Sequence, residues 1–551
     1  MDKADFMHIH SFCRLWIVFF IFFLFAICPA PSFSQGIPQR TIESGRISGL
    51  TTGESPAVHV FKGIPYAAPP IGGGRWSPPR PVAPWESVRE CTRFGPACPQ
   101  TDFLFRLYGT KLDHTSEDCL YLNVWSPAGG GNEKRPVMFW VHGGGNIAGA
   151  ASEPHYDGAA LAKQGVVVVT INYRLGVFGY FAHPFLSRES EHNASGNYGL
   201  LDQIAALKWV QRNIHAFGGD PDCVTLFGQS AGALSVCCLL ASPLARGLFH
   251  RAIVQSSPYP LAPLRQLRLP RPGMESMEEQ GLRLANELGC AQARDPLAQL
   301  RALPAERLLA GSHATVDQSG NRFAPVIDGW VMPKDIAEIF NEGKQTKVPF
   351  IIGSTAREGT IFTKDMVIED MNIPSYRAGV ERLFGNLAGD FLELYPVKRE
   401  SDIPKAMSDS LGDRFVAGAR AMARKMANLN AGVYLYHFTR EDPGRSGRVL
   451  GAYHGIEIPY VFNNLEKTRG PSDSRSRALA EIMSGAWVQF ARTGNPNQNG
   501  KLAWPAYDPA KDNHLEFGDS IQIGQGLRRR ACDFFEEFYA RQHIPRPAHL
   551  P

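Results

Sequence analysis

The sequence has little charge imbalance. Its 551 residues include 57 Lys and Arg against 53 Asp and Glu, a net charge of +4, and no basic block is interleaved with aromatic residues. This balance argues against nucleic acid as a partner. The sequence also lacks His and Cys clusters at metal-ligand spacing, so we expect no metal and no organic cofactor. It has no internal repeat that would indicate a solenoid.

Long apolar runs are almost absent as well. The run Leu15–Ile27 is shorter than the roughly 20 residues that a membrane-spanning helix needs. Lys3 and Arg14 precede it, and small residues up to Ser34 follow, as in a cleaved signal peptide. We therefore expect residues 1–34 to be a signal peptide, with no stable membrane span after cleavage. The mature protein would be secreted or periplasmic.

Two alternatives for the N-terminus stay open. One is an uncleaved anchor, and the other is lipid attachment at Cys28, although Ile27 is a poor residue before a lipidated cysteine.

No low-complexity linker follows the leader, so we expect residues 35–551 to form a single domain.

Strand and helix patterns alternate along that domain. The run 165–176 is almost entirely apolar, which is typical of a strand in the middle of a parallel sheet. The segment 199–219 has apolar residues at helical spacing and ends at two glycines. Such alternation predicts an α/β fold with a mostly parallel central sheet flanked by helices. Short antiparallel strands are expected near the N-terminus, at 41–50 and 58–70, together with large insertions.

A serine at the end of an apolar strand is the first chemical signal. In "VTLFGQSAGALSV", Ser230 stands between Gly228 and Gly232, where the strand turns into an apolar helix. A glycine-rich turn is the structural alternative. The order strand, turn and helix instead favours the nucleophile elbow of an α/β-hydrolase. Because a serine hydroxyl barely ionises at neutral pH, Ser230 would need a neighbouring base.

A glycine loop follows another buried strand, in "PVMFWVHGGG". Consecutive glycines allow backbone N–H groups to point at the negative oxygen that forms during ester cleavage. We expect Gly144 and Gly145 to supply two such donors and Ala231 the third.

Together these motifs resemble the type B carboxylesterases, the group of cholinesterases and para-nitrobenzyl esterases. The resemblance runs from about Thr41 to the end of the chain. It rests on eight ordered stretches: "FKGIPYAAPPIGGGRW", "SEDCLYLNVWSP", "VHGGGN", "NYRLGVFGY", "GNYGLLDQIAALKWVQRNIHAFGGDP", "VTLFGQSAG", "REGTIF" and "GAYHGIEIPYVF". It implies an α/β-hydrolase fold and a Ser–Glu–His triad in that chain order.

Carried onto this sequence, the resemblance makes Glu358 the acid and His454 the base. Glu358 follows the apolar run "VPFIIGS", so it lies near the carboxyl end of a strand, where α/β sites gather. His454 stands in a glycine-flanked loop. From the residues alone, His437 and Asp328 remain rivals for the two roles.

The resemblance further implies several structural pairs. Cys98 and Cys119 match a disulfide that closes a loop near the site, whereas Cys91 and Cys290 have no evident partners. Two buried ion pairs are also implied: Arg75 with Glu117 and Arg174 with Asp202.

The sequence departs from the family pattern near the nucleophile. Gln229 stands where many relatives carry glutamate, which should weaken attraction for cationic substrates. The loop between Cys98 and Cys119 has Phe103, Phe105 and Tyr108 but no tryptophan, so choline esters are not the expected substrate. Further candidates for the substrate pocket are Tyr259, Phe323 and Phe362, with an ordinary core role as the alternative.

The expected function is therefore a secreted serine carboxylesterase acting on a small-molecule ester. One alternative is a specialist for a bulky or anionic natural ester. Another is a non-catalytic binding protein on the same scaffold, which would have no reason to keep Ser230, Glu358, His454 and the glycine loop. The oligomeric state stays open.

Overall fold

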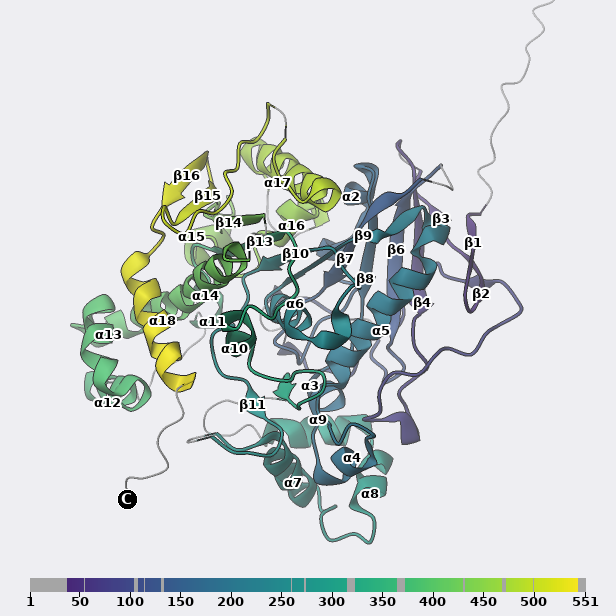
Figure 1. Cartoon of the computed structure of the whole chain (residues 1–551), viewed down its shortest axis with the longest axis horizontal. Helices are drawn as coiled ribbons and strands as arrows, with labels where there is room; N and C mark the ends of the chain where they lie inside the picture. Colours follow the sequence, from purple (N-terminus) through teal and green to yellow (C-terminus); the bar gives the residue numbers. More distant parts are fainter. Residues whose placement is uncertain are drawn as a thin grey trace, which may run out of the picture. The chain divides into compact units, whose positions relative to one another are not determined.

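The computed structural model describes most of the chain (Figure 1). The described residues are 37–543, apart from 54, 104–107, 113, 130–132, 259, 272–273, 315–322, 364–371, 430–431, 468–471 and 499. The expected signal peptide and Tyr259 therefore lie outside the described residues. From Ile37 onward the chain forms one compact unit.

An eleven-stranded sheet runs through this unit, in the order β16-β15-β14-β13-β10-β9-β7-β8-β6-β4-β3. The seven neighbours from β15 to β8 are parallel, and β16, β6, β4 and β3 pair antiparallel at the two edges. The expected α/β fold with a mostly parallel sheet is confirmed. The strands are β3 (Leu50–Thr51), β4 (Val58–Pro65), β6 (Tyr121–Pro127), β7 (Arg135–Val141), β8 (Val167–Ile171), β9 (Gly219–Gln229), β10 (Arg251–Gln255), β13 (Phe350–Thr355), β14 (Val433–Phe438), β15 (Asn513–Phe517) and β16 (Ile521–Gln525).

Helices cover both faces of the sheet, and alternate residues of one strand show this directly. In β7, Val137, Phe139 and Val141 join the core on one face, with side chains from α5 (Tyr198–Asn213), α6 (Ala231–Ala241) and α14 (Ile403–Ala427). Met138 and Trp140 join the core on the other face, with side chains from α2 (Ala159–Lys163), α16 (Ile458–Val461) and α17 (Ser474–Thr493). A strand covered on both faces has no polar side, which explains its unbroken apolar sequence.

The helices among the described residues follow the chain as marked in Figure 1. They are α2 (Ala159–Lys163), α3 (Gly176–Tyr180), α4 (Pro184–Glu189), α5 (Tyr198–Asn213), α6 (Ala231–Ala241), α7 (Met277–Glu287), α8 (Pro296–Ala302), α9 (Ala305–Ala314), α10 (Ile336–Asn341), α11 (Thr360–Thr363), α12 (Ile373–Phe384), α13 (Ala388–Leu394), α14 (Ile403–Ala427), α15 (Arg445–Leu450), α16 (Ile458–Val461), α17 (Ser474–Thr493) and α18 (Arg529–His543).

Local sequence signals explain several helix ends. Helix α5 passes into a short 3-10 turn, Ile214–Phe217, and ends at Gly218, whose φ of 76° suits glycine. Helix α7 begins with a capping box, in which Ser276 and Glu279 each accept a backbone N–H of the other.

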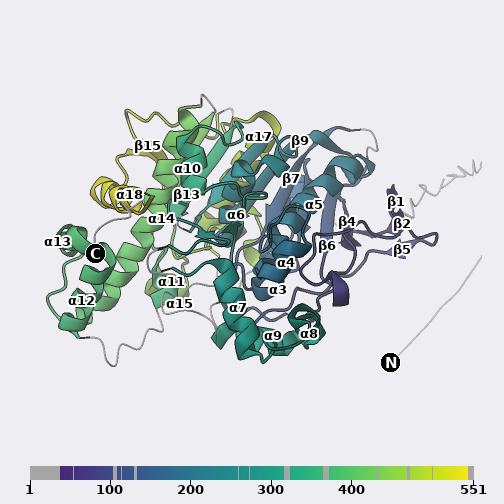
Figure 2. The ribbon, with the colours of Figure 1, turned by 60° about the horizontal axis from the view of Figure 1, so that its bottom comes forward.

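The insertions form two helical groups at the edges of the sheet. In the turned view, α7, α8 and α9 lie together below the sheet, and α12 and α13 lie beside α14 and α18 (Figure 2). The second group has its own apolar cluster, which includes Phe384 of α12, Phe391 of α13 and Phe535 of α18. The second group therefore has a core of its own, whereas α7, α8 and α9 pack into the main core.

The N-terminal strands are antiparallel, as expected. Strands β1 (Gln39–Ile42) and β2 (Gly45–Ser48) form a hairpin, and β5 (Arg89–Glu90) adds to it in parallel. Gly63 lies inside β4, at a register shift between Phe61 and Ile64, with φ 69°.

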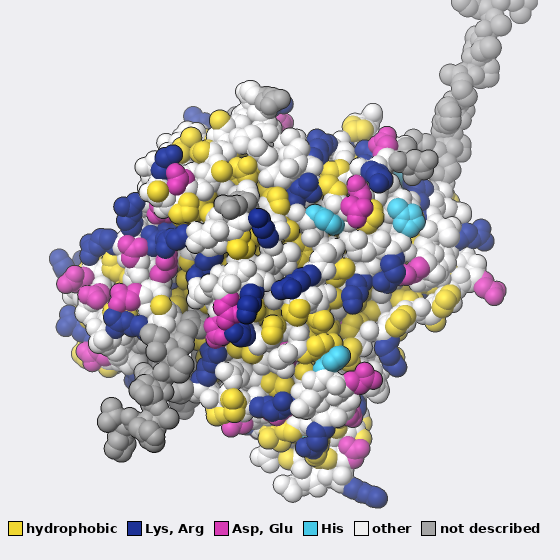
Figure 3. All heavy atoms as spheres, in the orientation of Figure 1, with side chains coloured by type: hydrophobic (Ala, Val, Ile, Leu, Met, Phe, Trp, Pro, Cys, Tyr) yellow, Lys and Arg dark blue, Asp and Glu magenta, His cyan; other side chains and the backbone are white. Residues whose placement is uncertain are grey.

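Two properties of the described structure bear on its possible binding partners, the distribution of surface charge and the apolarity of the helices. Figure 3 shows basic and acidic side chains interspersed over the face in view, so that face carries no broad field of one sign. Within the described ranges, no helix has both the length and the apolarity to cross a membrane.

Candidate active site

Ser230 occupies a sharp turn between β9 and α6. Its φ of 58° and ψ of −124° lie outside the ordinary regions for a residue other than glycine, a strain that is typical of functional sites. A Cβ added at Gly232 would lie 2.1 Å from the carbonyl oxygen of Val141, and one at Gly228 would lie 2.8 Å from the same atom. The two glycines are thus required because β7 passes directly beside the turn.

Glu358 and His454 meet although 96 residues separate them. Glu358 follows β13, is fully buried, and accepts the Thr355 N–H at 2.6 Å through Oε1. His454 lies between α15 and α16, and its Nδ1 donates to Glu358 Oε2 at 2.5 Å. A buried carboxylate with two such donors fixes both the position and the tautomer of the imidazole.

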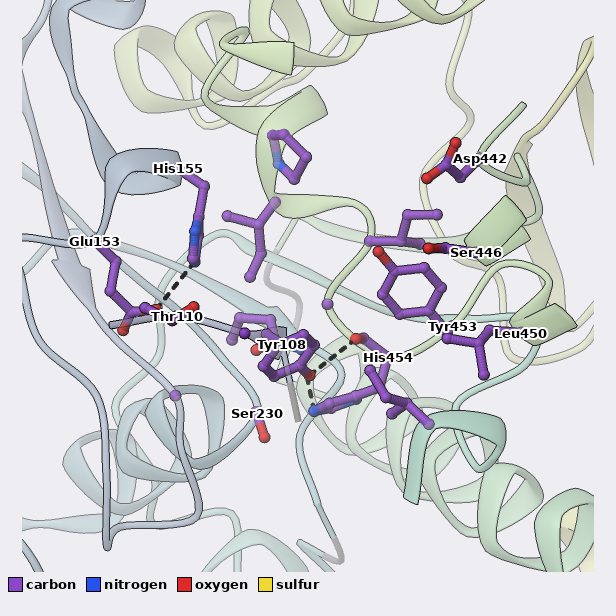
Figure 4. Close-up of a pocket in the computed structure, with 18 of the residues that line it drawn as sticks. Tyr108, Thr110, Glu153, His155, Ser230, Asp442, Ser446, Leu450, Tyr453 and His454 are labelled. Atoms are coloured by element: carbon purple, nitrogen blue, oxygen red, sulfur yellow. Dashed lines mark hydrogen bonds and ion pairs between the residues drawn. The ribbon is translucent and has the colours of Figure 1, made fainter. Parts of the chain in front are cut away.

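The other ring nitrogen of His454, Nε2, faces Gln229, the residue directly before Ser230. The amide Nε2 of Gln229 lies 3.2 Å from it. Ser230 and His454 line the same pocket (Figure 4). Among the described contacts, however, Ser230 makes no hydrogen bond to His454. The structure thus brings Ser230 and His454 to one pocket and joins His454 to the buried Glu358.

The glycine loop lies against this turn. Gly144 and Gly145 have φ of 104° and 66°, and a Cβ at Gly143 would lie 3.0 Å from Ser230 Cβ. In the described part of the chain, no backbone hydrogen bond uses the N–H of Gly144, Gly145 or Ala231, the first residue of α6. These three groups are the donors expected from the sequence, and all belong to segments that border Ser230.

His142 anchors the loop from behind. Its ring stacks on Tyr173 with centroids 4.5 Å apart, its Nδ1 contacts the Gly143 carbonyl at 2.8 Å, and the Tyr173 hydroxyl donates to the His142 carbonyl at 2.9 Å. Burial lowers the pKa of His142 to about 4, so the ring is neutral at pH 7.

The pocket that contains these residues is large, about 1360 Å³. Gln229 and Phe362 line it as expected. Phe323 does not: it is buried in the main core against Phe181, with ring centroids 6.0 Å apart. The local sequence of Phe323 does not distinguish a core phenylalanine from one that lines a pocket, so only the fold separates these two roles.

The structure adds lining residues that the sequence did not single out as site residues. Phe415 of α14 places its ring 5.1 Å from the His454 ring, the same distance as the ring of the expected Phe362. The Tyr108 hydroxyl donates to the His454 carbonyl at 3.1 Å. Figure 4 shows Glu153 and His155 on one side of the pocket and Asp442 and Ser446 on the other. Nothing in the local sequence marks these residues as neighbours.

Two further buried carboxyl groups, Glu457 and Glu153, have raised pKa values. Glu457 is fully buried, and burial together with nearby Glu358 raises its pKa to about 8. Burial raises the pKa of Glu153 to about 7, although its Oε1 accepts the Ala150 N–H. An acidic residue inside the apolar run "IEIPYVF" was the available sequence signal for Glu457.

The rival residues have structural roles. His437 is buried in β14, 3.4 Å from Ser354 Oγ, and burial with nearby Arg528 lowers its pKa to about 3. The Asp328 carboxylate accepts the backbone N–H groups of Trp330 and Met332 in a turn. Neither lines the pocket.

The pairs implied by the resemblance are present. Cys98 and Cys119 form a disulfide, and Cys91 and Cys290 are free and buried. Arg174 binds Asp202 through two hydrogen bonds of 2.8 and 2.7 Å. Arg75 binds Glu117 through Nε at 2.7 Å and also through Nη2. Within the described residues, no group of three or more His, Cys, Asp or Glu side chains is arranged to hold a metal ion.

Comparisons with known proteins agree with this geometry. Residues 37–535 match the Carboxylesterase family. The chain is 39% identical over 492 residues to the fumonisin B1 esterase of Sphingopyxis macrogoltabida, covering 87% of each chain. It is 38% identical to the para-nitrobenzyl esterase of Bacillus subtilis (strain 168), covering 88% of this chain and 95% of the relative. It is 34% identical to carboxylesterase 1C of Rattus norvegicus, covering 96% and 98%. This protein therefore belongs to the carboxylesterase family and is a carboxylic ester hydrolase.

Proposed function

We propose that this protein is a secreted serine carboxylesterase, with Ser230 as nucleophile, His454 as base and Glu358 as the acid of the triad. The observation that carries the proposal is that His454, which is hydrogen-bonded to the buried Glu358, lines the same pocket as a serine on a strained strand–helix turn. Ester hydrolysis itself follows from the family, whereas the residue roles are our assignment.

In the proposed mechanism, Ser230 Oγ attacks the acyl carbon while His454 Nε2 takes the hydroxyl proton. The carbonyl oxygen becomes negative and receives the N–H groups of Gly144, Gly145 and Ala231. These donors are fixed before the reaction, which is why they stabilise the developing charge efficiently. Glu358 stabilises the imidazolium that forms.

The second half of the reaction uses the same groups. The tetrahedral intermediate collapses, and the imidazolium gives its proton to the departing alcohol, leaving an acyl-enzyme on Ser230. Water then loses a proton to His454 and attacks the acyl carbon. Collapse of the second intermediate returns the proton to Ser230 and releases the carboxylic acid.

The direct test is Ser230→Ala together with organophosphate labelling. We expect the variant to lose ester turnover while it stays folded, and the label to appear on the Ser230 peptide of the wild type. Ser256→Ala is the matched control, because Ser256 is also buried, has φ 51° and directly follows the adjacent strand β10. An active Ser230→Ala enzyme, or a label on another residue, contradicts the assignment.

Export is the second part of the proposal. The apolar run Leu15–Ile27, preceded by Lys3 and Arg14, supports it, and the Cys98–Cys119 disulfide fits an oxidising compartment. N-terminal sequencing of the purified protein tests it. A mature chain that starts near Gln35 is expected, and a chain that still starts near Met1 rules out cleavage.

A bulky or anionic natural ester is a second candidate substrate. The cavity of about 1360 Å³ exceeds most small-ligand pockets, which are roughly 300–1,000 Å³. Lys111, Arg445 and Lys467 line it, and one relative is named for the ester fumonisin B1. A panel of p-nitrophenyl esters of rising chain length, with an anionic polyol ester included, separates this candidate from a general carboxylesterase.

A further inference from the structure

The side chain of Gln229 contacts the nitrogen that the proposed mechanism needs. Gln229 is the last residue of β9, directly before Ser230, and is 4% exposed. Its amide nitrogen lies 3.2 Å from His454 Nε2. The same nitrogen must later receive the Ser230 proton, so the two residues compete for one site.

The chemistry of this contact depends on the state of the imidazole. Nδ1 carries its hydrogen toward Glu358, so Nε2 of the neutral ring has one lone pair and can accept one N–H. A protonated ring would bring an N–H of His454 against an N–H of Gln229. The contact therefore fits the neutral imidazole and disfavours the imidazolium.

The surrounding loops hold the amide in place. A Cβ added at Gly143 would lie 3.1 Å from Gln229 Oε1, and one added at Gly455 would lie 3.5 Å from Gln229 Nε2. Gln229 thus sits in a slot between the glycine loop and the histidine loop. A side chain at either glycine would fill part of that slot.

We propose that Gln229 is a positioning residue for the hydrolysis proposed above. In the resting enzyme its amide donates to His454 Nε2 and keeps the neutral ring in place. When an ester binds, the ring exchanges this donor for the hydroxyl of Ser230. The inference rests on the proposed roles of Ser230 and His454 and adds the residue that holds the base between turnovers.

Other groups face His454 and have to be kept constant in a test. Glu358 bonds it, Glu457 lies three residues further on, and Tyr108 bonds its carbonyl, while Tyr453 precedes it. From helices α11 and α14, the rings of Phe362 and Phe415 lie beside the His454 ring. Glu153 and Glu457 also titrate near neutral pH. They are unchanged in every variant below, so differences between profiles report on Gln229.

The test is the pH dependence of kcat/KM for p-nitrophenyl acetate in two variants. Gln229→Met keeps the length of the side chain and removes the donor. We expect the acid limb of its profile, the side on which kcat/KM falls as pH decreases, to move to higher pH by about half a unit. This shift corresponds to the free energy of one modest hydrogen bond. Gln229→Glu replaces the donor with a carboxylate that favours the imidazolium, and we expect an upward move of about one unit or more.

Gln203→Met is the matched control. Gln203 is equally buried and bonds Ser235 at 3.1 Å, not the triad, so its acid limb should coincide with that of the wild type. KM and kcat are measured separately, since a purely structural defect lowers activity at all pH values without moving the limb.

An acid limb that is unchanged or moves downward overturns the inference, and either Gln229 variant suffices if the other fails to fold. Failure of the proposed function has a different signature, because the wild type would then lack turnover or organophosphate label on Ser230. A wild type that is active and labelled, with variants whose limbs coincide with its own, removes the role of Gln229 alone.

Discussion

Replacing Glu358 with Gln tests the proposed triad at its most constrained contact. The two carboxylate oxygens receive different donors, Thr355 N–H at 2.6 Å and His454 Nδ1–H at 2.5 Å. A Gln side chain has one oxygen and one NH₂ group, so it satisfies only one donor. If its NH₂ faced Thr355, two buried donors would oppose each other, at a cost of about 1–3 kcal/mol.

The favoured orientation therefore keeps the oxygen on Thr355 and turns the NH₂ toward His454. Nδ1 must then accept, which moves the ring hydrogen to Nε2 and removes the lone pair that should take the Ser230 proton. The negative charge that stabilises the imidazolium is lost as well. We expect kcat to fall by about 10³- to 10⁴-fold, equivalent to roughly 4–5.5 kcal/mol of activation free energy.

The assay is steady-state hydrolysis of p-nitrophenyl acetate at pH 7, with circular dichroism to verify folding. Glu457→Gln is the matched control, because Glu457 is equally buried and its raised pKa of about 8 leaves it mostly protonated at pH 7. An amide closely mimics a protonated carboxyl, so we expect a loss of less than about threefold for that variant. A folded Glu358→Gln enzyme that retains more than about a tenth of wild-type kcat would refute the assignment of the acid.

Three further variants test the structure around the site. Glu457 keeps its proton in the folded state up to about pH 8 and loses it near pH 4.5 when unfolded. Its contribution to stability therefore falls as pH rises between these values. We expect Glu457→Gln to raise Tm more at pH 9 than at pH 5. Gly232→Ala would place a Cβ 2.1 Å from the Val141 carbonyl oxygen and should lower both soluble yield and activity at least tenfold. Cys98→Ala opens the bridge to Cys119 and should lower the free energy of unfolding by about 3 kcal/mol in urea titrations.

The glycine and disulfide variants each have a control in the same chain, and the Glu457 variant is compared with itself at two pH values. For the pH effect, equal Tm gains at both pH values would contradict a shifted Glu457. For the glycine, Gly379→Ala in α12 adds a Cβ with nothing within 4 Å and should stabilise by up to about 1 kcal/mol. For the disulfide, Cys290→Ala changes a buried free cysteine, and only the wild type and this control should lose stability on reduction.

The local parts of the site were predictable because short-range chemistry specifies them. An apolar strand, a glycine, a serine and a second glycine determine a turn that exposes Ser230, and β9 and α6 flank it as expected. Two of the glycines after β7, Gly144 and Gly145, likewise adopt the positive φ that a loop of inward N–H groups needs. Periodicity was also sufficient for the parallel strands and for α5.

The partners of Ser230 were not determined by local sequence. The chain has 16 histidines, and His437 and His454 both fit a bottom-up description of the base. Only the resemblance to carboxylesterases separated them before the structure did. Phe323 shows the same limit, since its sequence surroundings do not distinguish a core phenyl ring from a pocket lining.

By itself, the sequence determined which backbone segments become strand, helix and turn, and where a serine and glycine loop stand at strand ends. The tertiary structure alone decided that His454 Nε2 faces Gln229, across 225 residues, and that Glu457 is buried nearby. The physical reason is range. Backbone dihedrals and side-chain periodicity are set within a few residues. Which loops meet is decided instead by the order of the strands in the sheet, here β14, β13, β10 and β9. That order is set by packing over the whole core.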